Sequence, residues 1–315
     1  MGNDSFADAT LVLVGHGSTL NAESAAPTYQ HADALRRRGI FGQVLEAFWK
    51  QEPYLAGVLR GAFGRRVFVV PLFISDGYFT EEVIPRELGF GLKRDLFFPL
   101  QRRGEQILFY CGPVGTHESM TEVLLARASE VIGKHPFPRA PRPDETALFV
   151  AGHGTGRNEN SRMAIERQVE LIRRRNIYAE VHAVFMEEDP RIGDCYRMAS
   201  ARHVVLVPFF ISDGLHSYED IPVMLGEPER VVQARLKSGQ PTWRNPTERQ
   251  GKLVWYASSI GSEPHMAEVI LERVREAAAR NPIPADGNAP DPTSAPDAFG
   301  ALGASGASGA SGASV

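Results

Sequence analysis

The sequence has few of the features that mark a disulfide-linked, membrane-spanning or nucleic-acid-binding protein. Only two of its 315 residues are cysteines, Cys111 and Cys195, and they lack CxxC spacing, so neither a disulfide framework nor an iron–sulfur site is expected. No run reaches the roughly 18 apolar residues of a membrane helix. The stretch from Met1 to Ala9 has neither the basic start nor the apolar core of a signal peptide. A formal charge of −4 argues against bulk binding of nucleic acid. The sequence therefore predicts a cytoplasmic protein that binds neither membranes nor nucleic acids.

What the sequence does contain is an internal repeat. The segment Leu11-Val-Leu-Val-Gly-His-Gly17 returns as Leu148-Phe-Val-Ala-Gly-His-Gly154, and Val69-Val-Pro-Leu-Phe-Ile-Ser-Asp-Gly77 returns as Leu206-Val-Pro-Phe-Phe-Ile-Ser-Asp-Gly214. Both pairs are separated by 137 positions, so no gap intervenes. Self-similarity of this kind indicates that one structural unit occurs twice. The chain is thus predicted to be a tandem duplication.

Each copy alternates short apolar runs with amphipathic segments, which is typical of βαβ units on a parallel sheet. Strands are expected near 10–14, 43–49, 66–74 and 106–110 in the first copy, and near 146–151, 179–186, 202–211 and 252–257 in the second. A third repeated block, Gly115 to Met120, returns 146 positions later, before the last helix. The prediction is an α/β fold of two tandem four-stranded parallel-sheet domains related by pseudo-twofold symmetry.

Composition suggests where these domains begin and end. The first is predicted to span residues 1–135 and the second 146–280, with a proline-rich linker at 136–145. From residue 281 to 315 the chain is rich in proline, alanine and glycine and ends in Gly-Ala-Ser repeats. A segment of this composition cannot bury a core, so we predict a disordered tail.

In each copy, one histidine stands between two glycines directly after the first strand. His16 and His153 occupy the carboxyl end of that strand, the edge of an open α/β sheet where ligands usually bind. Flanking glycines allow a ligand to approach the backbone closely. The alternative is a tight turn in which the histidine forms only a local hydrogen bond.

The loop after the third strand adds further candidates, but in the second copy only. There Ser212-Asp-Gly-Leu-His216-Ser-Tyr-Glu219-Asp220 offers an imidazole and two carboxylates. His153 and His216 would meet at neighbouring strand ends and could bind one divalent cation. In the first copy Phe79 replaces His216 and Val83 replaces Asp220. Helix-start electrostatics is the alternative explanation for the two acids.

Acidic residues also follow the second strand of the second copy. Glu187 and Glu188 come directly after Met186 and precede Asp189. They could supply a metal ligand or a proton acceptor. A solvated start to the next helix explains them equally well.

In order and spacing, these blocks resemble the class II chelatases, specifically the CbiX/SirB-type sirohydrochlorin chelatases, over about residues 10–280. The resemblance implies an enzyme, a lyase, that inserts Co²⁺ or Fe²⁺ into a tetrapyrrole for cobalamin or siroheme synthesis. The divalent metal would be a substrate, with no tightly bound cofactor. The family pattern places metal-binding histidines in the Gly-His-Gly and six residues before the Ile-Pro proline. Only the second copy has both, as His153 and His216.

The resemblance also implies roles for the neighbouring residues. Glu187 or Glu188 would complete the metal site, and Glu219 or Asp220 would accept protons or orient an imidazole. The macrocycle would lie in the cleft between the copies, against His16 and Phe79. Because the substrate carries many carboxylates, arginines should line the rim. The candidates are Arg86, Arg157 and Arg162, for which exposed helix positions are the alternative explanation.

Two other functions fit parts of the pattern. Histidine phosphatases also open on a strand and a histidine, but they require an arginine before it, where this chain has Gly15 and Gly152. A tetrapyrrole- or metal-binding chaperone with a chelatase fold and no turnover is the stronger alternative. The sequence leaves open whether the protein is a monomer or a homodimer.

Overall fold

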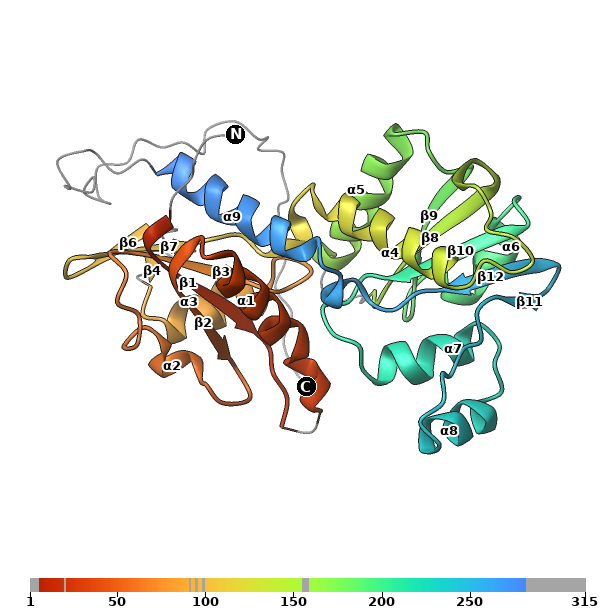
Figure 1. The fold of residues 1–315 in the computed structure, drawn as a ribbon, viewed down its shortest axis with the longest axis horizontal. Coiled ribbons are helices and arrows are strands. Elements are labelled where there is room, and N and C mark those ends of the chain that lie inside the picture. The colour runs from red at the N-terminus through yellow and green to blue at the C-terminus, as the bar shows by residue number, and fades with distance from the viewer. Residues whose placement is uncertain are drawn as a thin grey trace, which may run out of the picture.

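The protein is described here from a computed structural model covering residues 6–19, 21–90, 92–93, 96–97, 100–154 and 159–281. The predicted tail, apart from Asn281, lies outside these residues. Two α/β halves stand side by side, the first in red to orange and the second in green to cyan (Figure 1). Within the described ranges, no helix is long and apolar enough to cross a membrane.

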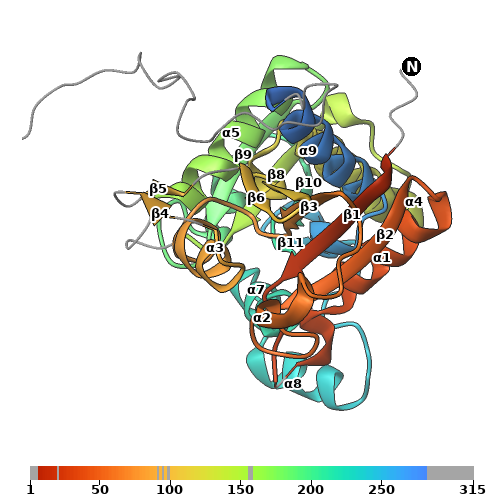
Figure 2. The ribbon, with the colours of Figure 1, turned by 90° about the vertical axis from the view of Figure 1, so that its left-hand side faces the viewer.

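The first half contains a mixed sheet and short helices. Its strands are β1 (Phe6–Gly15), β2 (Phe41–Phe48), β3 (Arg66–Pro71), β6 (Leu100–Arg103) and β7 (Gln106–Tyr110), with a separate small hairpin of β4 (Leu92–Lys93) and β5 (Leu96–Phe97). Its helices are α1 (Ala26–Arg38), α2 (Leu55–Val58), α3 (Ile84–Glu87) and α4 (Met120–Lys134). Viewed from this half, β1 and β2 lie side by side next to α1 (Figure 2).

The second half repeats this order of elements, except that a helix replaces the small hairpin. Its strands are β8 (Thr146–Gly152), β9 (Glu180–Phe185), β10 (His203–Pro208), β11 (Thr247–Arg249) and β12 (Lys252–Tyr256). Its helices are α5 (Asn160–Arg174), α6 (Cys195–Met198), α7 (Ile221–Met224), α8 (Glu229–Lys237) and α9 (Met266–Arg280). Helix α8 lies in the stretch that makes the second copy longer.

The strand orders agree between the halves, which confirms the predicted duplication. The first sheet runs β2-β1-β3-β7-β6 and the second β9-β8-β10-β12-β11. Registers agree too, since Thr10 pairs with Val67 as Ala147 pairs with Val204. The predicted count of four strands is wrong, because each sheet gains a fifth, antiparallel edge strand. These strands, β6 and β11, are short and polar, so they lack the apolar run by which the other strands were recognised.

The last helix of each half covers the sheet of the other half. Helix α4 packs on β10 and β12, whereas α9, blue in Figure 1, packs on β3 and β7. The inner faces of both sheets therefore share one hydrophobic cluster, which joins Leu11 and Phe68 to Leu148 and Trp255. The predicted limits at 135 and 146 stay predictions, but a unit cut there would lose the helix that covers its sheet.

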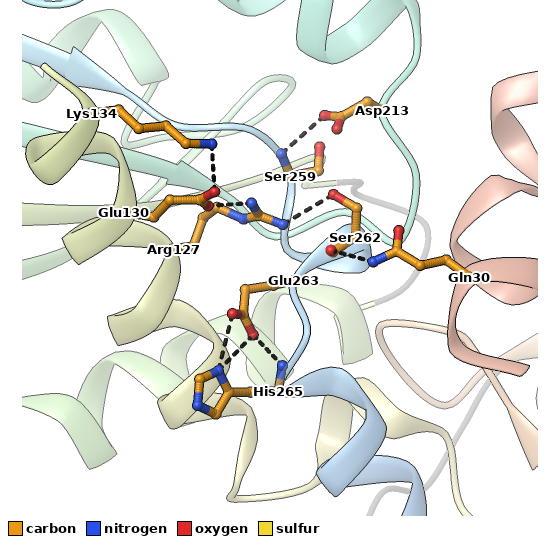
Figure 3. A network of polar contacts seen from close by, with 9 residues as sticks. All are labelled: Gln30, Arg127, Glu130, Lys134, Asp213, Ser259, Ser262, Glu263 and His265. Atoms are coloured by element: carbon orange, nitrogen blue, oxygen red, sulfur yellow. Dashed lines mark hydrogen bonds and ion pairs between the residues drawn. The ribbon is translucent and has the colours of Figure 1, made fainter. Parts of the chain in front are cut away.

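Equivalent arginines hold the exchanged helices in place. Arg127 in α4 donates to Ser262 Oγ at 3.0 Å and to Glu130, and Lys134 pairs with the same glutamate (Figure 3). At the equivalent position of α9, Arg273 donates to Thr116 Oγ1 at 2.6 Å. Two further bonds from Arg273 reach the carbonyl of Pro113. Both guanidinium groups are buried, so these bonds form where water does not compete with them.

Helix α1 adds contacts to the same seam. Gln30 donates to the carbonyl of Ser262 at 2.8 Å, and His31 Nε2 lies 2.6 Å from the carbonyl of Gly261. Burial lowers the pKa of His31, so its imidazole is neutral and donates this bond. The loop after β12 is thereby fixed to the first half.

Exchange of the helices predicts that neither half is stable alone. Helix α9 buries Met266, Val269, Ile270, Leu271 and Val274, which together contribute on the order of 10 kcal/mol, as much as a whole domain's stability. Fragments 1–135 and 136–281 should each lack a cooperative thermal transition, and an equimolar mixture should regain one. Calorimetry of the fragments and of the mixture tests this. A cooperative transition in either isolated fragment would contradict it.

Removing Arg273 should destabilise the protein far more than removing Arg280, although both pair with Glu276. Arg273→Ala leaves buried acceptors unpaired and should lower the free energy of unfolding by about 3 kcal/mol. Arg280 is exposed, so Arg280→Ala should cost less than about 0.5 kcal/mol. Urea denaturation of both variants measures the difference, and equal losses would refute the role given to Arg273.

Candidate functional site

The Gly-His-Gly turns depend on both of their glycines. A Cβ atom on Gly152 would lie 2.0 Å from Ile165 Cδ1, and one on Gly15 would lie 2.6 Å from Thr28 Oγ1. The first glycine therefore lets α5 or α1 pack tightly against the strand end. The second glycine, Gly154 or Gly17, adopts φ of 66° or 68°, the left-handed region that favours glycine. The turn presents its histidine at the carboxyl edge of the sheet, as predicted.

Each of these histidines has one ring nitrogen occupied by its own turn. His153 Nδ1 lies 3.0 Å from the carbonyl of Gly154, and His16 Nδ1 lies 2.9 Å from that of Gly17. A carbonyl only accepts, so Nδ1 carries the proton and donates it. The lone pair is then on Nε2, which is the atom left for a metal or a proton.

A carboxylate binds Nδ1 of His216, as a carbonyl binds Nδ1 of His153. His216 begins a π-helical turn, His216–Asp220, of a kind that is frequent at functional sites. Within this turn His216 Nδ1 lies 2.6 Å from Asp220 Oδ2. Because the carboxylate accepts the Nδ1 proton, the Nε2 lone pair of His216 is also available, and the carboxylate makes it a stronger donor to a metal.

The two imidazoles are close enough to share one ion. The ring centres of His153 and His216 are 5.1 Å apart, with the planes nearly perpendicular. An ion bound to Nε2 at about 2.1 Å, as zinc is, would place two rings at a tetrahedral angle with their centres roughly 5 Å apart. The observed spacing therefore fits two imidazole ligands on one divalent cation.

Of the acids after β9, Glu187 lies nearer to this pair. Its Oε1 is 3.7 Å from His153 Nε2, and its side chain is exposed. Glu188 is instead bound by Arg162, whose Nη1 lies 3.2 Å from Oε2. Among the residues that the structure describes, no three His, Cys, Asp or Glu side chains are gathered tightly enough to hold a metal. An ion held by the two histidines alone would keep coordination positions open for other ligands.

The first copy has the same scaffold without these ligands. His16 and Phe79 have ring centres 4.9 Å apart, in place of the histidine pair. Phe79 also contacts the rings of Trp49 and Phe73. Lys50 and Gln51 stand where the second copy has Glu187 and Glu188. An apolar ring and a lysine cannot ligate a cation as the second copy could.

A cleft of about 320 Å³ opens between the halves. It is lined from both copies, by His16 and Phe73 on one side and by Phe210 and His216 on the other. The two halves also touch where Asn160 Nδ2, at the start of α5, donates to the carbonyl of Asp76 at 3.2 Å. Sequence reasoning expected the substrate in such a cleft, and the structure brings His16 to it.

The remaining predicted residues are distributed differently. Glu219 accepts a hydrogen bond from Gln233 of α8. Arg162 is engaged by Glu166 and Glu188. Arg86 lines a separate hollow of about 340 Å³ between α2, α3 and β6, whose lining shares no residue with the cleft. Arg157 lies outside the described residues. Arg86 and Arg162 therefore do not line the cleft, and the substrate-binding role of all three arginines stays a prediction.

Neither cysteine belongs to the site. Burial raises the pKa of both Cys111 and Cys195 to about 12, so both are protonated thiols and poor metal ligands. Sequence reasoning did not identify the support behind the histidine loop, where Asp213 Oδ1 accepts from the Ser259 amide at 2.9 Å, and Ser217 Oγ lies 2.9 Å from Ser259 Oγ. The repeat of Asp76 as Asp213 was the available signal.

Known proteins match most of the chain. The CbiX family model matches twice, at residues 10–131 and 147–277. A probable sirohydrochlorin cobaltochelatase of Halobacterium salinarum is 44% identical over 280 residues, covering 85% of this chain and 91% of that protein.

Solved structures agree on the fold. A multi-domain Deinococcus radiodurans protein with structural similarity to chelatases is 31% identical with a TM-score of 0.68, covering 86% of this chain, which spans only 54% of that protein. SirB of Bacillus subtilis, solved with Fe³⁺, has a TM-score of 0.60 at 18% identity, covering 86% of this chain and 96% of SirB. With the family model matching both repeats, this chain belongs to the CbiX family of chelatases.

Proposed function

We propose that this protein inserts a divalent metal into sirohydrochlorin, and that it prefers Co²⁺ to Fe²⁺. As a CbiX chelatase it is an enzyme of metal insertion. The observation that carries the proposal is the pair His153 and His216, whose rings lie 5.1 Å apart with both Nε2 atoms available. The substrate and the preference for cobalt are supported by the name of the Halobacterium relative.

The geometry suits the handling of a metal that is cargo. Neutral imidazoles bind Co²⁺ and Fe²⁺ while leaving them exchangeable, unlike a closed four-ligand site. Glu187 is near enough to steady the ion electrostatically before the macrocycle takes over its coordination. The pyrrole nitrogens would replace the imidazoles one after another, and the ion would leave the protein with the macrocycle. The metal would thus be a substrate, and no cofactor would be tightly bound. The predicted cytoplasmic location, and the choice between cobalamin and siroheme synthesis, stay predictions.

Metal binding should depend on the second copy alone. His153→Ala or His216→Ala should weaken Co²⁺ binding at least tenfold, because a single imidazole holds the ion poorly. His16→Ala should leave Co²⁺ affinity within about twofold, since Phe79 gives that histidine no partner ligand. Isothermal titration of Co²⁺ into the three variants tests the assignment. Loss of binding in the His16 variant with normal binding in the His216 variant would move the site to the first copy.

Substitution of Asp220 should weaken Co²⁺ binding more than substitution of its neighbour Glu219. Asp220→Asn weakens the acceptor at His216 Nδ1, and loss of such support typically lowers metal affinity about 10- to 100-fold. Glu219→Gln, the control, alters a bond to Gln233 and should change Co²⁺ affinity less than threefold. The Co²⁺ absorption spectrum of each variant reports the ligand set directly. Equal effects of the two substitutions would exclude a specific role for Asp220.

A turnover assay separates a catalyst from a carrier. Conversion of sirohydrochlorin to its cobalt complex, followed by absorbance with the enzyme well below the substrate concentration, requires turnover. A chaperone would stop at one product per chain.

A further inference from the structure

The hollow between α2, α3 and β6 in the first half carries a surplus of positive charge. Arg60, Arg86 and Arg103 line it, and its lining shares no residue with the cleft. Among the described lining residues the one carboxylate is that of Glu87, whose Oε1 lies 3.6 Å from Arg86 Nε. The part of the chain that the structure describes supplies no carboxylate to Arg60 or Arg103. Two positive charges at this hollow therefore lack an internal counterion.

The second half shows which partners an arginine at the place of Arg103 can have. Its counterpart is Arg249, since each is the last residue of its edge strand and pairs with the first residue of the next strand. Arg249 Nη2 lies 3.2 Å from Glu227 Oε1, and Arg249 Nη1 donates to the carbonyl of Gly226. In the second half, the charge of this arginine is therefore balanced by a buried carboxylate of the same chain.

The first half lacks both of these partners. The position of the glutamate is taken by Phe90, whose amide donates to the carbonyl of Pro85 just as the glutamate's amide donates to the equivalent proline. The carbonyl of Gly89, which corresponds to the glycine carbonyl, instead accepts a bond from Gln101 Nε2 at 3.0 Å. Arg103 thus keeps the charge of its counterpart without either of its partners.

Arg60 lacks a carboxylate for the same kind of reason. Its counterpart 137 positions later is Arg197, whose Nη2 lies 3.2 Å from Asp194 Oδ1. The residue of the first half at the position of that aspartate is Gly57. A Cβ atom on Gly57 would lie 3.3 Å from Arg60 Nη2, so the guanidinium lies directly beside the place where the carboxylate would attach.

A third difference between the halves gives the hollow its space and its apolar floor. In the second half the ring of Tyr196 reaches across, and its hydroxyl donates to the carbonyl of Leu225 at 2.7 Å. The counterpart of this tyrosine is Leu59, a shorter side chain without a hydroxyl, and it lines the hollow. The other leucines of the lining are Leu55, Leu88 and Leu108. A short carbon frame could pack on these leucines while the arginines bind its charged groups.

We propose that this hollow binds a small anion with at least two carboxylate or phosphate groups, separately from the macrocycle in the cleft. The anion would supply the negative charge that Glu227 and Asp194 supply in the second half. Guanidinium groups bind carboxylate and phosphate oxygens in the same forked geometry, so both chemical groups suit the site. The volume of about 340 Å³ is at the lower end for small-molecule sites, which suits a small anion rather than a whole tetrapyrrole.

Isothermal titration of the full chain with pyrophosphate and with citrate, in metal-free buffer of low ionic strength, tests the proposal. Pyrophosphate carries only phosphate groups and citrate only carboxylates, so the two probes distinguish the chemical groups. At least one should bind with one-to-one stoichiometry and a Kd of about 1 mM or lower. Arg60→Gln and Arg103→Gln should each weaken that binding about tenfold or more, because each removes charge-assisted hydrogen bonds. Arg197→Gln is the matched control and should change the affinity less than about twofold, since that arginine already has its carboxylate.

A further variant adds the missing carboxylate in place of removing a cation. Gly57→Asp should pair with Arg60 as Asp194 pairs with Arg197, and so weaken binding of the probe by a factor similar to that of Arg60→Gln. Arg60 and Arg103 are exposed, and a Cβ atom on Gly57 meets only the end of a flexible side chain. The melting temperature of all three variants should therefore match that of the wild type, which circular dichroism measures.

Three results would overturn the proposal. The first is that neither probe binds at about 10 mM, a concentration at which a site of millimolar affinity would be nearly filled. The second is binding that the Arg60, Arg103 and Gly57 variants retain, because the anion would then lie elsewhere on the surface. The third is displacement of the bound probe by sirohydrochlorin, which would make the hollow part of the substrate site. Binding is measured here without metal insertion, so failure of the proposed function would leave these results unchanged.

Discussion

The exchange of helices α4 and α9 is the constraint on which the remaining structure depends. On each sheet, helix α1 or α5 of the same half covers only part of the apolar face, and the last helix of the opposite half buries the rest. The buried side chains of Arg127 and Arg273 then bind the loops that follow β12 and β7, respectively. Because both halves need the exchange, their relative position is fixed, and so is the distance across the cleft between them.

This rigidity allows one scaffold to serve two different uses. Gly-His-Gly turns recur in both halves with the same backbone geometry, since packing and positive φ require glycine at equivalent places. The side chains that follow have diverged. His216 and Asp220 of the second half occupy the positions of Phe79 and Val83 in the first half. Divergence of a few side chains on a shared frame thus leaves a histidine pair, the proposed metal site, in one half and an apolar, aromatic wall in the other.

The proposed metal site has well-oriented imidazoles but few ligands. Hydrogen bonds from Nδ1 to Gly154 and to Asp220 fix both imidazoles with Nε2 available. Two imidazoles without a complete set of further ligands hold an ion less tightly than a closed site. For the proposed transfer of an ion to a macrocycle, fixed orientation with modest affinity is the useful combination.

The sequence by itself determined the duplication, the parallel strands, the family and the histidine pair, because these depend on local patterns repeated at fixed spacing. It could not show the edge strands β6 and β11, whose polar residues carry no apolar period. The helix exchange was also invisible, since an amphipathic helix does not specify which of two similar sheets it covers. Likewise, only the tertiary structure turned Glu219 toward Gln233, engaged Arg162 with Glu188 and placed His16 opposite His216. Those outcomes depend on which side chains meet in space, and residues far apart in sequence decide that.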